Sequence, residues 1–165
     1  MNQLNFGCGP DVREGWENVD LQKGKGITKN FDFNKFPYPL KKDHYDFIYI
    51  ANVLEHLEKP REVLFELWKA CKKNAIIQIT APYYNNKGAY DDLTHLHYFS
   101  EVAFTNFARE AYLINKERKF EVAQVVLRPT RIGRLLPKKI REKLSLFVGG
   151  LISQTDAKLR VIKNL

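Results

Sequence analysis

The sequence predicts a single α/β domain over residues 1–165, built on a mostly parallel sheet. Its length of 165 residues fits one domain and leaves little room for a second. Residues 45–52 and 75–81 are nearly continuous apolar runs, which are typical of strands covered on both faces. Residues 60–72 and 100–113 instead repeat apolar side chains with helical spacing. Alternation of buried strands with amphipathic helices favours the α/β class.

The first half of the chain supplies four expected strands and one helix. Residues 3–6 form a short apolar run that ends at a glycine, and residues 17–21 form a second run. Residues 27–33 carry a weak third strand, and residues 45–52 a fourth. Pro60 suits the first turn of the helix over residues 60–72. The apolar stripe of this helix consists of Val63, Leu64, Leu67 and Cys71.

The second half supplies three more strands and a second helix. Residues 75–81 form a strand that ends at Pro82, and Ser100 can cap a helix over residues 100–113. Its inward positions are Val102, Phe104, Phe107, Ala108 and Ala111. Residues 120–127 and 155–162 form the last two strands. We expect the final strand to be antiparallel, at one edge of a seven-stranded sheet.

The first connection is too short for a crossover helix. Residues 8–15 separate the first glycine from Trp16, whereas a crossover helix needs about ten to twelve residues. We therefore expect a loop or a single helical turn, which leaves part of one sheet face thinly covered. A second subunit is the simplest cover, so the sequence favours a homodimer.

Composition and charge narrow the function classes. Residues 1–115 carry 14 basic and 15 acidic side chains, and residues 116–165 carry 13 and 4, so the net charge of +8 belongs to the C-terminal third. Cys8 and Cys71 cannot form a disulfide framework or a four-cysteine zinc site. The N-terminus lacks the features of a signal peptide, and no run approaches the ~20 apolar residues of a membrane span. We therefore expect a cytoplasmic protein.

Residues 128–154 form a basic insert before the last strand. From Pro137 onward, a helix would place Ile140, Leu144, Phe147, Leu151 and Ile152 on one side. Its cations Lys138, Lys139, Arg141 and Lys143 would lie largely elsewhere. Residues 134–152 could thus make a peripheral contact at the inner membrane face or bind RNA phosphates. They could equally pack on the sheet or on a second subunit. Nucleic acid is the less favoured partner, because few aromatic residues interrupt the basic stretch.

A glycine turn marks a candidate ligand site. Gly7 and Gly9 directly follow the first strand, and Asp20 ends the second strand eleven residues after Gly9. Glycine permits a sharp turn and a close approach of a ligand to the backbone, and an acid at this position can accept both hydroxyls of a ribose. The glycine turn lacks the third glycine of the dinucleotide-binding motif, and the sequence contains no P-loop motif. Asp11 would also repel a phosphate. These features favour a nucleoside without phosphates.

The sequence resembles a large enzyme family at this point. The segments LNFGCG, ENVDL, YDFIYIANVLEHL and IIQITAP occur in order over residues 3–100. They resemble the class I, Rossmann-like, S-adenosylmethionine-dependent methyltransferases of the small GCG…GWxNVD…VLEHL type. The resemblance implies a three-layer Rossmann-like fold and S-adenosylmethionine as cofactor. It also implies methyl transfer.

The resemblance further assigns cofactor-binding residues. Gly7 and Gly9, with Cys8 between them, match the turn under the methionine part of the cofactor. Asp20, followed by Leu21, matches the ribose-binding acid. The pair that meets adenine corresponds to Asp32 and Phe33. The strand end that lines the sulfonium corresponds to Ala51, Asn52 and Val53, and it is followed by the matching Leu54, Glu55 and His56.

Methyl transfer to a neutral hydroxyl needs a general base near the methyl group. The long polar loop over residues 83–98 leaves the carboxyl end of a central strand, so we expect it to form the acceptor pocket and lid. His95 is the candidate base, although it could instead fix the loop. We assign His56, Tyr83, Tyr84 and His97 to the acceptor site, with turn shaping or packing as their alternatives. His95 and His97 with Asp91 and Asp92 lack a fourth ligand dictated by pattern, so we expect no catalytic metal.

The sequence thus favours O-methylation of a small-molecule or glycolipid acceptor. Two other functions stay open. One is an RNA methyltransferase, and the other is a non-catalytic scaffold subunit that binds S-adenosylmethionine.

Overall fold

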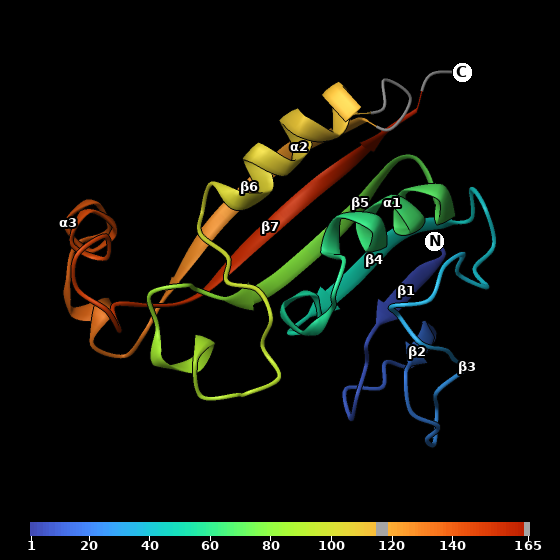
Figure 1. Cartoon of the computed structure of the whole chain (residues 1–165), viewed down its shortest axis with the longest axis horizontal. Helices are drawn as coiled ribbons and strands as arrows, with labels where there is room; N and C mark the ends of the chain where they lie inside the picture. The colour runs from blue at the N-terminus through green and yellow to red at the C-terminus, as the bar shows by residue number, and fades with distance from the viewer. Residues whose placement is uncertain (115–118, 164–165) are drawn as a thin grey trace.

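The computed structural model describes residues 1–114 and 119–163, and its seven strands form one sheet in the order β3-β2-β1-β4-β5-β7-β6 (Figure 1). β1, β2, β3, β4 and β5 pair in parallel, whereas β7 runs antiparallel to both β5 and β6. The strands are β1 (Gln3–Phe6), β2 (Glu17–Asp20), β3 (Lys29–Asn30), β4 (Tyr45–Ala51), β5 (Cys71–Pro82), β6 (Lys119–Pro129) and β7 (Ile152–Ile162). The expected mostly parallel α/β sheet with an antiparallel last strand is confirmed.

The expected edge position of the last strand is wrong, because β7 lies between β5 and β6. Ala157, Leu159 and Val161 of β7 are almost fully buried, while the residues between them are partly exposed. This alternation is consistent with the strand expected over residues 155–162, and it arises because helices cover only one face of the sheet in the described part of the chain. The sheet edge is instead β6, whose residues are mostly half-buried or exposed.

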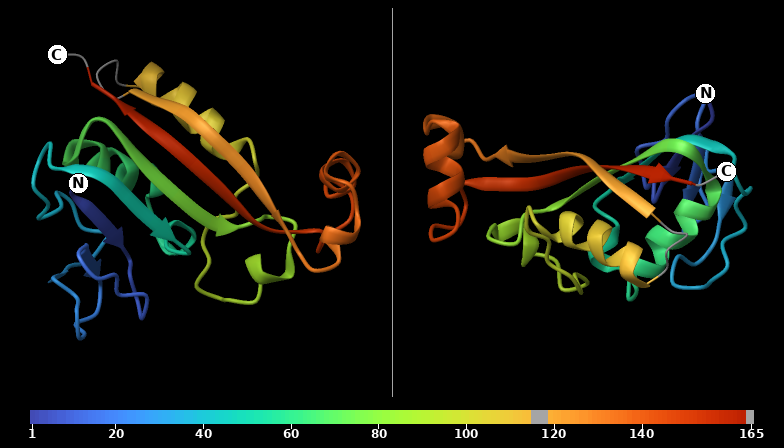
Figure 2. Two further views of the ribbon diagram at one scale, coloured as in Figure 1. Left: turned by 180° about the vertical axis from the view of Figure 1, so that it is seen from behind. Right: turned by 90° about the horizontal axis from the view of Figure 1, so that it is seen from above.

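Helices α1 (Pro60–Ala70) and α2 (Ala103–Ile114) lie on the same face of the sheet (Figure 2). Leu67 of α1 and Phe104 of α2 are almost fully buried and belong to the core with Ile79 of β5 and Leu159 of β7. Each such side chain contributes roughly 1.5–3 kcal/mol by leaving water. α2 begins three residues after Ser100, and the carbonyl oxygen of Ser100 accepts a hydrogen bond from the Ala103 N–H at 3.3 Å.

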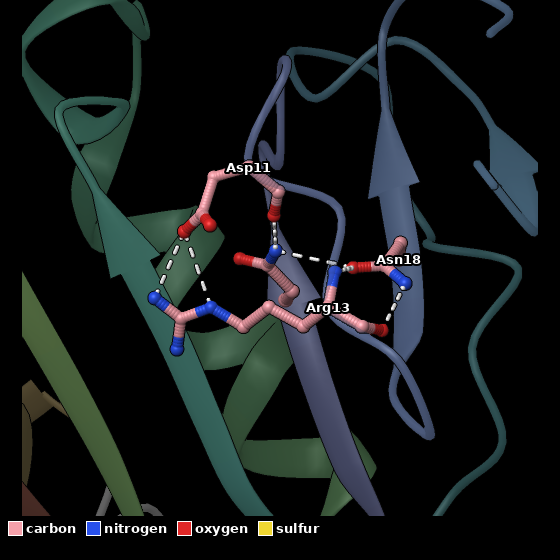
Figure 3. A network of polar contacts seen from close by, with 4 residues as sticks. Asp11, Arg13 and Asn18 are labelled. Atoms are coloured by element: carbon pink, nitrogen blue, oxygen red, sulfur yellow. Dashed lines mark hydrogen bonds and ion pairs between the residues drawn. The ribbon is translucent and has the colours of Figure 1, made fainter. Parts of the chain in front are cut away.

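The short first connection is a loop without a helix, as the chain length predicted. Two buried asparagines hold it in place (Figure 3). Asn18 Oδ1 accepts from the Arg13 N–H at 2.9 Å, and Asn18 Nδ2 donates to the Arg13 carbonyl oxygen at 2.9 Å. Asn5 Nδ2 donates to the Asp11 carbonyl oxygen and to Asn18 Oδ1. Side-chain amides therefore satisfy backbone groups that a helix would otherwise pair.

The face of the sheet opposite α1 and α2 carries no helix within residues 1–114 and 119–163 (Figure 2). The helical layer implied there by a three-layer fold is therefore missing from the described chain. Arg13 lies over this face instead, with its guanidinium carbon 3.9 Å from the ring centre of Tyr49 and 5.0 Å from that of Trp16. Phe47 and Tyr49 stay half-exposed. Coverage by a second subunit remains a prediction.

The basic insert forms a projection at the far end of the β6–β7 hairpin (Figure 2). It contains the 3-10 turn η3 (Gly133–Leu135) and the short helix α3 (Lys138–Leu144). The longer amphipathic helix expected from Pro137 is wrong, because the chain turns back at Gly150, whose φ is +78°. Leu151 and Ile152 are consequently buried, and Ile152 is the first residue of β7.

The projection exposes apolar side chains beside its cations. Arg141 is buried and donates to the carbonyl oxygens of Gly133 and Leu136, so it braces the projection rather than facing solvent. The large apolar side chains that stay at least half exposed are Ile132, Leu135, Ile140, Leu146, Phe147 and Val148. None of the helices in the described part of the chain combines the length and the apolar character needed to cross a bilayer.

Candidate functional site

The glycine turn lies where β1, β2 and β4 end. Gly7 and Gly9 have φ values of +72° and +47°, in the left-handed region that glycine tolerates. The Gly7 N–H donates to the Val19 carbonyl oxygen at 2.9 Å. A Cβ atom on Gly7 would lie 2.3 Å from Cγ2 of Val53, so the turn touches the segment that follows β4. The sequence expected Gly7, Gly9 and Val53 in one site, and the structure brings them together.

The Asp20 carboxylate lies beside this turn. Its Oδ2 accepts a hydrogen bond from the Gly9 N–H at 2.7 Å, and its Oδ1 accepts one from the Gln22 N–H at 3.1 Å. Each carboxylate oxygen has a second lone pair, so Asp20 retains acceptor capacity for ribose hydroxyls. Leu21 is exposed next to it. Cys8 is buried, and this burial, with the nearby Asp20 carboxylate, raises the pKa of its thiol. Cys8 therefore fills space as a neutral thiol.

The two residues expected to meet adenine differ in burial, because Asp32 lies at the surface and Phe33 lies in the core. Asp32 remains partly exposed, and its Oδ1 accepts from the Asn34 N–H at 2.9 Å. Phe33 is only 6% exposed, and its ring stacks on that of Phe6 with 4.0 Å between centroids. Its aromatic surface is thus occupied by the core, which corrects the assignment of Phe33 as a side chain that meets adenine. Phe31, two residues earlier, is only partly buried.

The end of β4 carries an unusual backbone conformation. Ala51 is the last residue of the strand, and Asn52 follows with a φ of +53°. Its N–H donates to the Thr80 carbonyl oxygen at 2.9 Å. A non-glycine residue at positive φ is uncommon and tends to occur at functional sites. Asn52 is exposed at the same sheet edge as the glycine turn, which agrees with its expected place in a ligand site.

The 3-10 turn η1 (Leu54–His56) brings three chemically active side chains together. The carbonyl oxygen of Glu55 accepts from the N–H groups of Leu96 and His97 at 2.7 and 3.1 Å, which docks the loop of residues 83–98 onto η1. His95 consequently lies against His56, with 4.6 Å between ring centroids. One ligand atom from each of Glu55, His56 and His95 lies within 4.8 Å of the others. We call these three residues the Glu–His–His cluster.

Glu55 is the most unusual member of the cluster. It is 1% exposed, and neither of its carboxylate oxygens accepts a hydrogen bond from another residue in the described part of the chain. Burial raises the pKa of Glu55 to about 7. In the sequence, Glu55 matches the family's segment after the fourth strand without an assigned chemical role, although an acid within the apolar stretch VLEHL is itself a signal of function.

The hydrogen bonds of the cluster fix the proton positions on both imidazoles. The Thr94 hydroxyl donates its proton to Asp92 Oδ1 at 2.7 Å, so it accepts from His56 Nδ1 at 2.8 Å. His95 Nδ1 lies 2.8 Å from the Ala89 carbonyl oxygen, which can only accept. Both rings therefore carry a proton on Nδ1, and in the neutral ring the lone pair lies on Nε2, where a substrate or an ion could bind.

The remaining acceptor-site residues lie less favourably. Tyr83 is 0% exposed and its hydroxyl donates to Glu101 at 2.9 Å, so it packs in the core and presents no surface to an acceptor. This corrects its assignment as an acceptor-binding residue. Tyr84 is half-buried against Tyr83, with 4.8 Å between ring centroids. His97 lies outside the Glu–His–His cluster, with its ring 6.5 Å from that of Phe99.

An exposed aromatic pair lies on the same loop as His95. The rings of Tyr90 and Tyr98 stack with 4.8 Å between centroids, and both stay about half exposed. Leu93 and Leu96 are exposed between them in the sequence. The sequence did not indicate this pair, because seven residues separate Tyr90 from Tyr98 and only the folded loop stacks the two rings.

No protein-family model and no curated protein sequence matches the chain. Solved structures do resemble it. A methyltransferase dependent on S-adenosylmethionine from Archaeoglobus fulgidus matches 97% of this chain and 86% of its own, with a TM-score of 0.66 and 18% identity. One from Mesorhizobium loti matches 96% and 90%, with a TM-score of 0.62 and 14% identity. The cyclase SpnF matches 99% and 75%, with a TM-score of 0.66 and 13% identity. The chain therefore has the Rossmann-like fold of methyltransferases that use S-adenosylmethionine.

Proposed function

We propose that the protein transfers a methyl group from S-adenosylmethionine to a hydroxyl of a small-molecule or glycolipid acceptor. The observation that carries this proposal is the arrangement of Gly7, Gly9 and Asp20 at the carboxyl ends of adjoining parallel strands. In this sheet order, ligands bind at that edge. Asp20 would hold the ribose, and the glycine turn and Asn52 would lie along the methionine part and the sulfonium.

Methyl transfer is an in-line displacement. The acceptor oxygen forms a bond to the methyl carbon, the carbon–sulfur bond breaks, and its electron pair stays on sulfur in S-adenosylhomocysteine. The hydroxyl proton must pass to a base. His95 supports this step, because its Nδ1–H is held by the Ala89 carbonyl oxygen and its Nε2 lone pair is available. The remaining task of the protein is to position the acceptor and exclude water.

The loop of residues 83–98 supports an acceptor with an extended apolar or sugar-like part. The stacked rings of Tyr90 and Tyr98 offer a half-exposed aromatic surface on the loop that carries His95. Sugar rings and acyl chains both pack against such surfaces through their C–H groups. The nearby exposed side chains of Leu93 and Leu96 extend the same apolar character.

The projection that carries α3 supports delivery of this acceptor from a lipid surface. It exposes Phe147 and Leu135, and its exposed cations are Arg131, Arg134, Lys138, Lys139 and Lys143. Each cation near anionic lipid adds about 1 kcal/mol. Asn85 ties the acceptor loop to the projection, because its Nδ2 donates to the Ser145 carbonyl oxygen at 2.8 Å and its own carbonyl oxygen accepts from the Gly150 N–H at 3.0 Å.

Calorimetric titration tests the cofactor. We expect the wild type to bind S-adenosylmethionine and S-adenosylhomocysteine. Asp20→Ala should weaken both at least 10- to 100-fold, because even a single hydrogen bond to a charged acceptor contributes about 1.5–3 kcal/mol. Glu14→Ala removes an exposed acid of the same charge from the adjacent loop and serves as the matched control. Absence of binding to the wild type would refute the proposal.

Turnover measurements test the methyl transfer, and vesicle binding tests the contact with a lipid surface. We expect His95→Gln to retain cofactor binding and to lower methyl transfer to a hydroxyl acceptor by about 10²- to 10⁴-fold. Cofactor binding without transfer to any acceptor would favour the non-catalytic scaffold. We expect the protein to bind phosphatidylglycerol vesicles more tightly than phosphatidylcholine vesicles, and Phe147→Ser to weaken this binding. RNA binding that weakens with salt, without vesicle binding, would favour the RNA methyltransferase.

A further inference from the structure

We propose that the Glu–His–His cluster binds a divalent transition-metal ion, and that this ion activates the acceptor hydroxyl of the proposed methyl transfer. Only the role of the ion in activating the hydroxyl rests on that proposed function. Metal binding itself follows from Glu55, His56 and His95, which bring one carboxylate and two imidazoles within 4.8 Å. No metal was expected from the sequence, where the candidate ligands were His95 and His97 with Asp91 and Asp92, without Glu55.

Glu55 supplies the first argument for an ion. Its side chain is 1% exposed, and within residues 1–114 and 119–163 no other residue donates a hydrogen bond to either oxygen. A buried carboxylate without a partner is costly, and proteins normally pair such a group with a cation or a metal. The structure places no lysine or arginine as its partner among the described residues. The groups that it meets in the cluster are the two imidazoles.

The imidazoles supply the second argument. Histidines that bind a metal usually donate the N–H of the other ring nitrogen to a carbonyl, hydroxyl or carboxylate oxygen. His95 Nδ1 donates to the Ala89 carbonyl oxygen, and His56 Nδ1 donates to the Thr94 hydroxyl, which Asp92 orients in turn. Both rings are thus held with Nε2 as a lone pair. With neutral rings and an ionised Glu55, the cluster presents two Nε2 lone pairs and one carboxylate, an arrangement that suits a cation.

The donor set indicates the class of ion. Two imidazole nitrogens with one carboxylate oxygen bind Zn²⁺ and related transition metals, whereas Ca²⁺ and Mg²⁺ favour oxygen ligands. Bonds of about 2.0–2.2 Å hold ligand atoms closer than 4.8 Å, so binding would draw the three side chains together. Three protein ligands leave a coordination position open, as in catalytic zinc sites.

An ion at this position has a task in the proposed reaction. The acceptor hydroxyl would occupy the open position, and the ion would lower the pKa of that hydroxyl so that its proton passes to water. The resulting alkoxide attacks the methyl carbon, and sulfur keeps the electron pair of the broken bond. His95 then acts as a ligand, and the ion takes over the work that a base would otherwise do.

Titration of metal-free protein with Zn²⁺ and with Mn²⁺ in a calorimeter tests the site. We expect one ion per chain for at least one of the two metals. Glu55→Gln keeps the size of the side chain but removes its charge, and we expect it to weaken binding at least tenfold. His44→Gln changes a histidine that lies outside the cluster and should leave binding unchanged. Circular dichroism checks folding, and His56→Gln replaces Glu55→Gln if the latter fails to fold.

The outcomes separate this inference from the proposed function. Absence of binding by the wild type, or equal binding by the cluster variant, would overturn the metal site. Methyl transfer that persists in metal-free enzyme with chelator would overturn the role of the ion and leave His95 as a direct base. Loss of transfer on chelation, with recovery on adding Zn²⁺ or Mn²⁺, would support it. Failure to bind S-adenosylmethionine would overturn the proposed function and leave the metal titration intact.

Discussion

Gly7→Ala tests the contact between the glycine turn and the end of β4. Gly7 has a φ of +72°, and an added Cβ atom would lie 2.3 Å from Cγ2 and 3.1 Å from Cγ1 of Val53. Two separate costs follow. A left-handed conformation costs a non-glycine residue roughly 1–2 kcal/mol, and an extra methyl group in a packed region typically costs about 1–3 kcal/mol. We expect Gly7→Ala to lower the free energy of unfolding by about 2–5 kcal/mol.

Gly15 provides a matched control for the first cost. Its φ is +77°, and apart from its two chain neighbours no described residue has a heavy atom within 4 Å of the position of its Cβ. Gly15→Ala should therefore cost only the conformational strain, about 1–2 kcal/mol. The difference between the two variants isolates the clash with Val53. Unfolding in urea, monitored by circular dichroism, measures both free energies.

A double-mutant cycle completes the test. Val53→Ala removes both Cγ atoms that Gly7→Ala would meet. In the Val53→Ala background, Gly7→Ala should cost mainly the strain of about 1–2 kcal/mol, because only the Cβ atom of residue 53 remains nearby, at 3.3 Å, so the two substitutions should couple favourably. Equal costs for Gly7→Ala and Gly15→Ala, or additive costs for Gly7→Ala and Val53→Ala, would refute the packing of the turn against the end of β4.

Three further predictions concern stability. Asn18→Ala should lower the free energy of unfolding by about 2–4 kcal/mol, because it leaves buried backbone groups of the first loop unpaired; a change below 0.5 kcal/mol would contradict the network. Leu159→Ala, at a fully buried position of β7, should cost about 2–5 kcal/mol in urea unfolding, and a negligible cost would contradict the interior position of this strand. Burial alone would raise the pKa of Glu17, but hydrogen bonds from Lys29 and Tyr45 outweigh it and lower that pKa below 4.5. Its contribution is therefore present above pH 4.5 and is lost as the pH falls through the folded pKa, so Glu17→Gln should weaken the acid dependence of stability.

Local patterns in the sequence predicted most helices and strands, but they did not predict which strands pair in the sheet. The apolar runs gave β4 and β5, and the helical stripes gave α1 and α2, because burial imposes a period on neighbouring residues. The interior position of β7 depends on β5 and β6, which lie far from it in the chain. Its alternating pattern reflects the uncovered face of the sheet. Periodicity reports how many faces are buried and not which strands are neighbours.

The candidate site shows the same limit. The spacing from Gly9 to Asp20 indicated their proximity, because the ends of adjoining parallel strands meet at one edge. Phe33 and Phe31 flank the same acid, and only packing against Phe6 decides that Phe33 belongs to the core. The contact between Glu55 and His95, which are forty positions apart in the sequence, depends on the loop of residues 83–98 docking onto η1. Backbone hydrogen bonds of this kind leave no local pattern in the sequence.

The missing first helix also bears on the choice of cofactor. In dinucleotide-binding folds, the helix after the first strand points its N-terminus at a pyrophosphate, and its dipole favours negative charge. Here residues 8–15 form a loop held by Asn5 and Asn18, so the turn has no helix dipole behind it. Carboxylates surround the turn instead, from Asp20 and from Asp11, which is paired with Arg13. Because Arg13 offsets the charge of Asp11, the Asp20 carboxylate is the charge that a ligand would meet at the turn; it disfavours phosphates and is compatible with the positive sulfonium of the proposed cofactor.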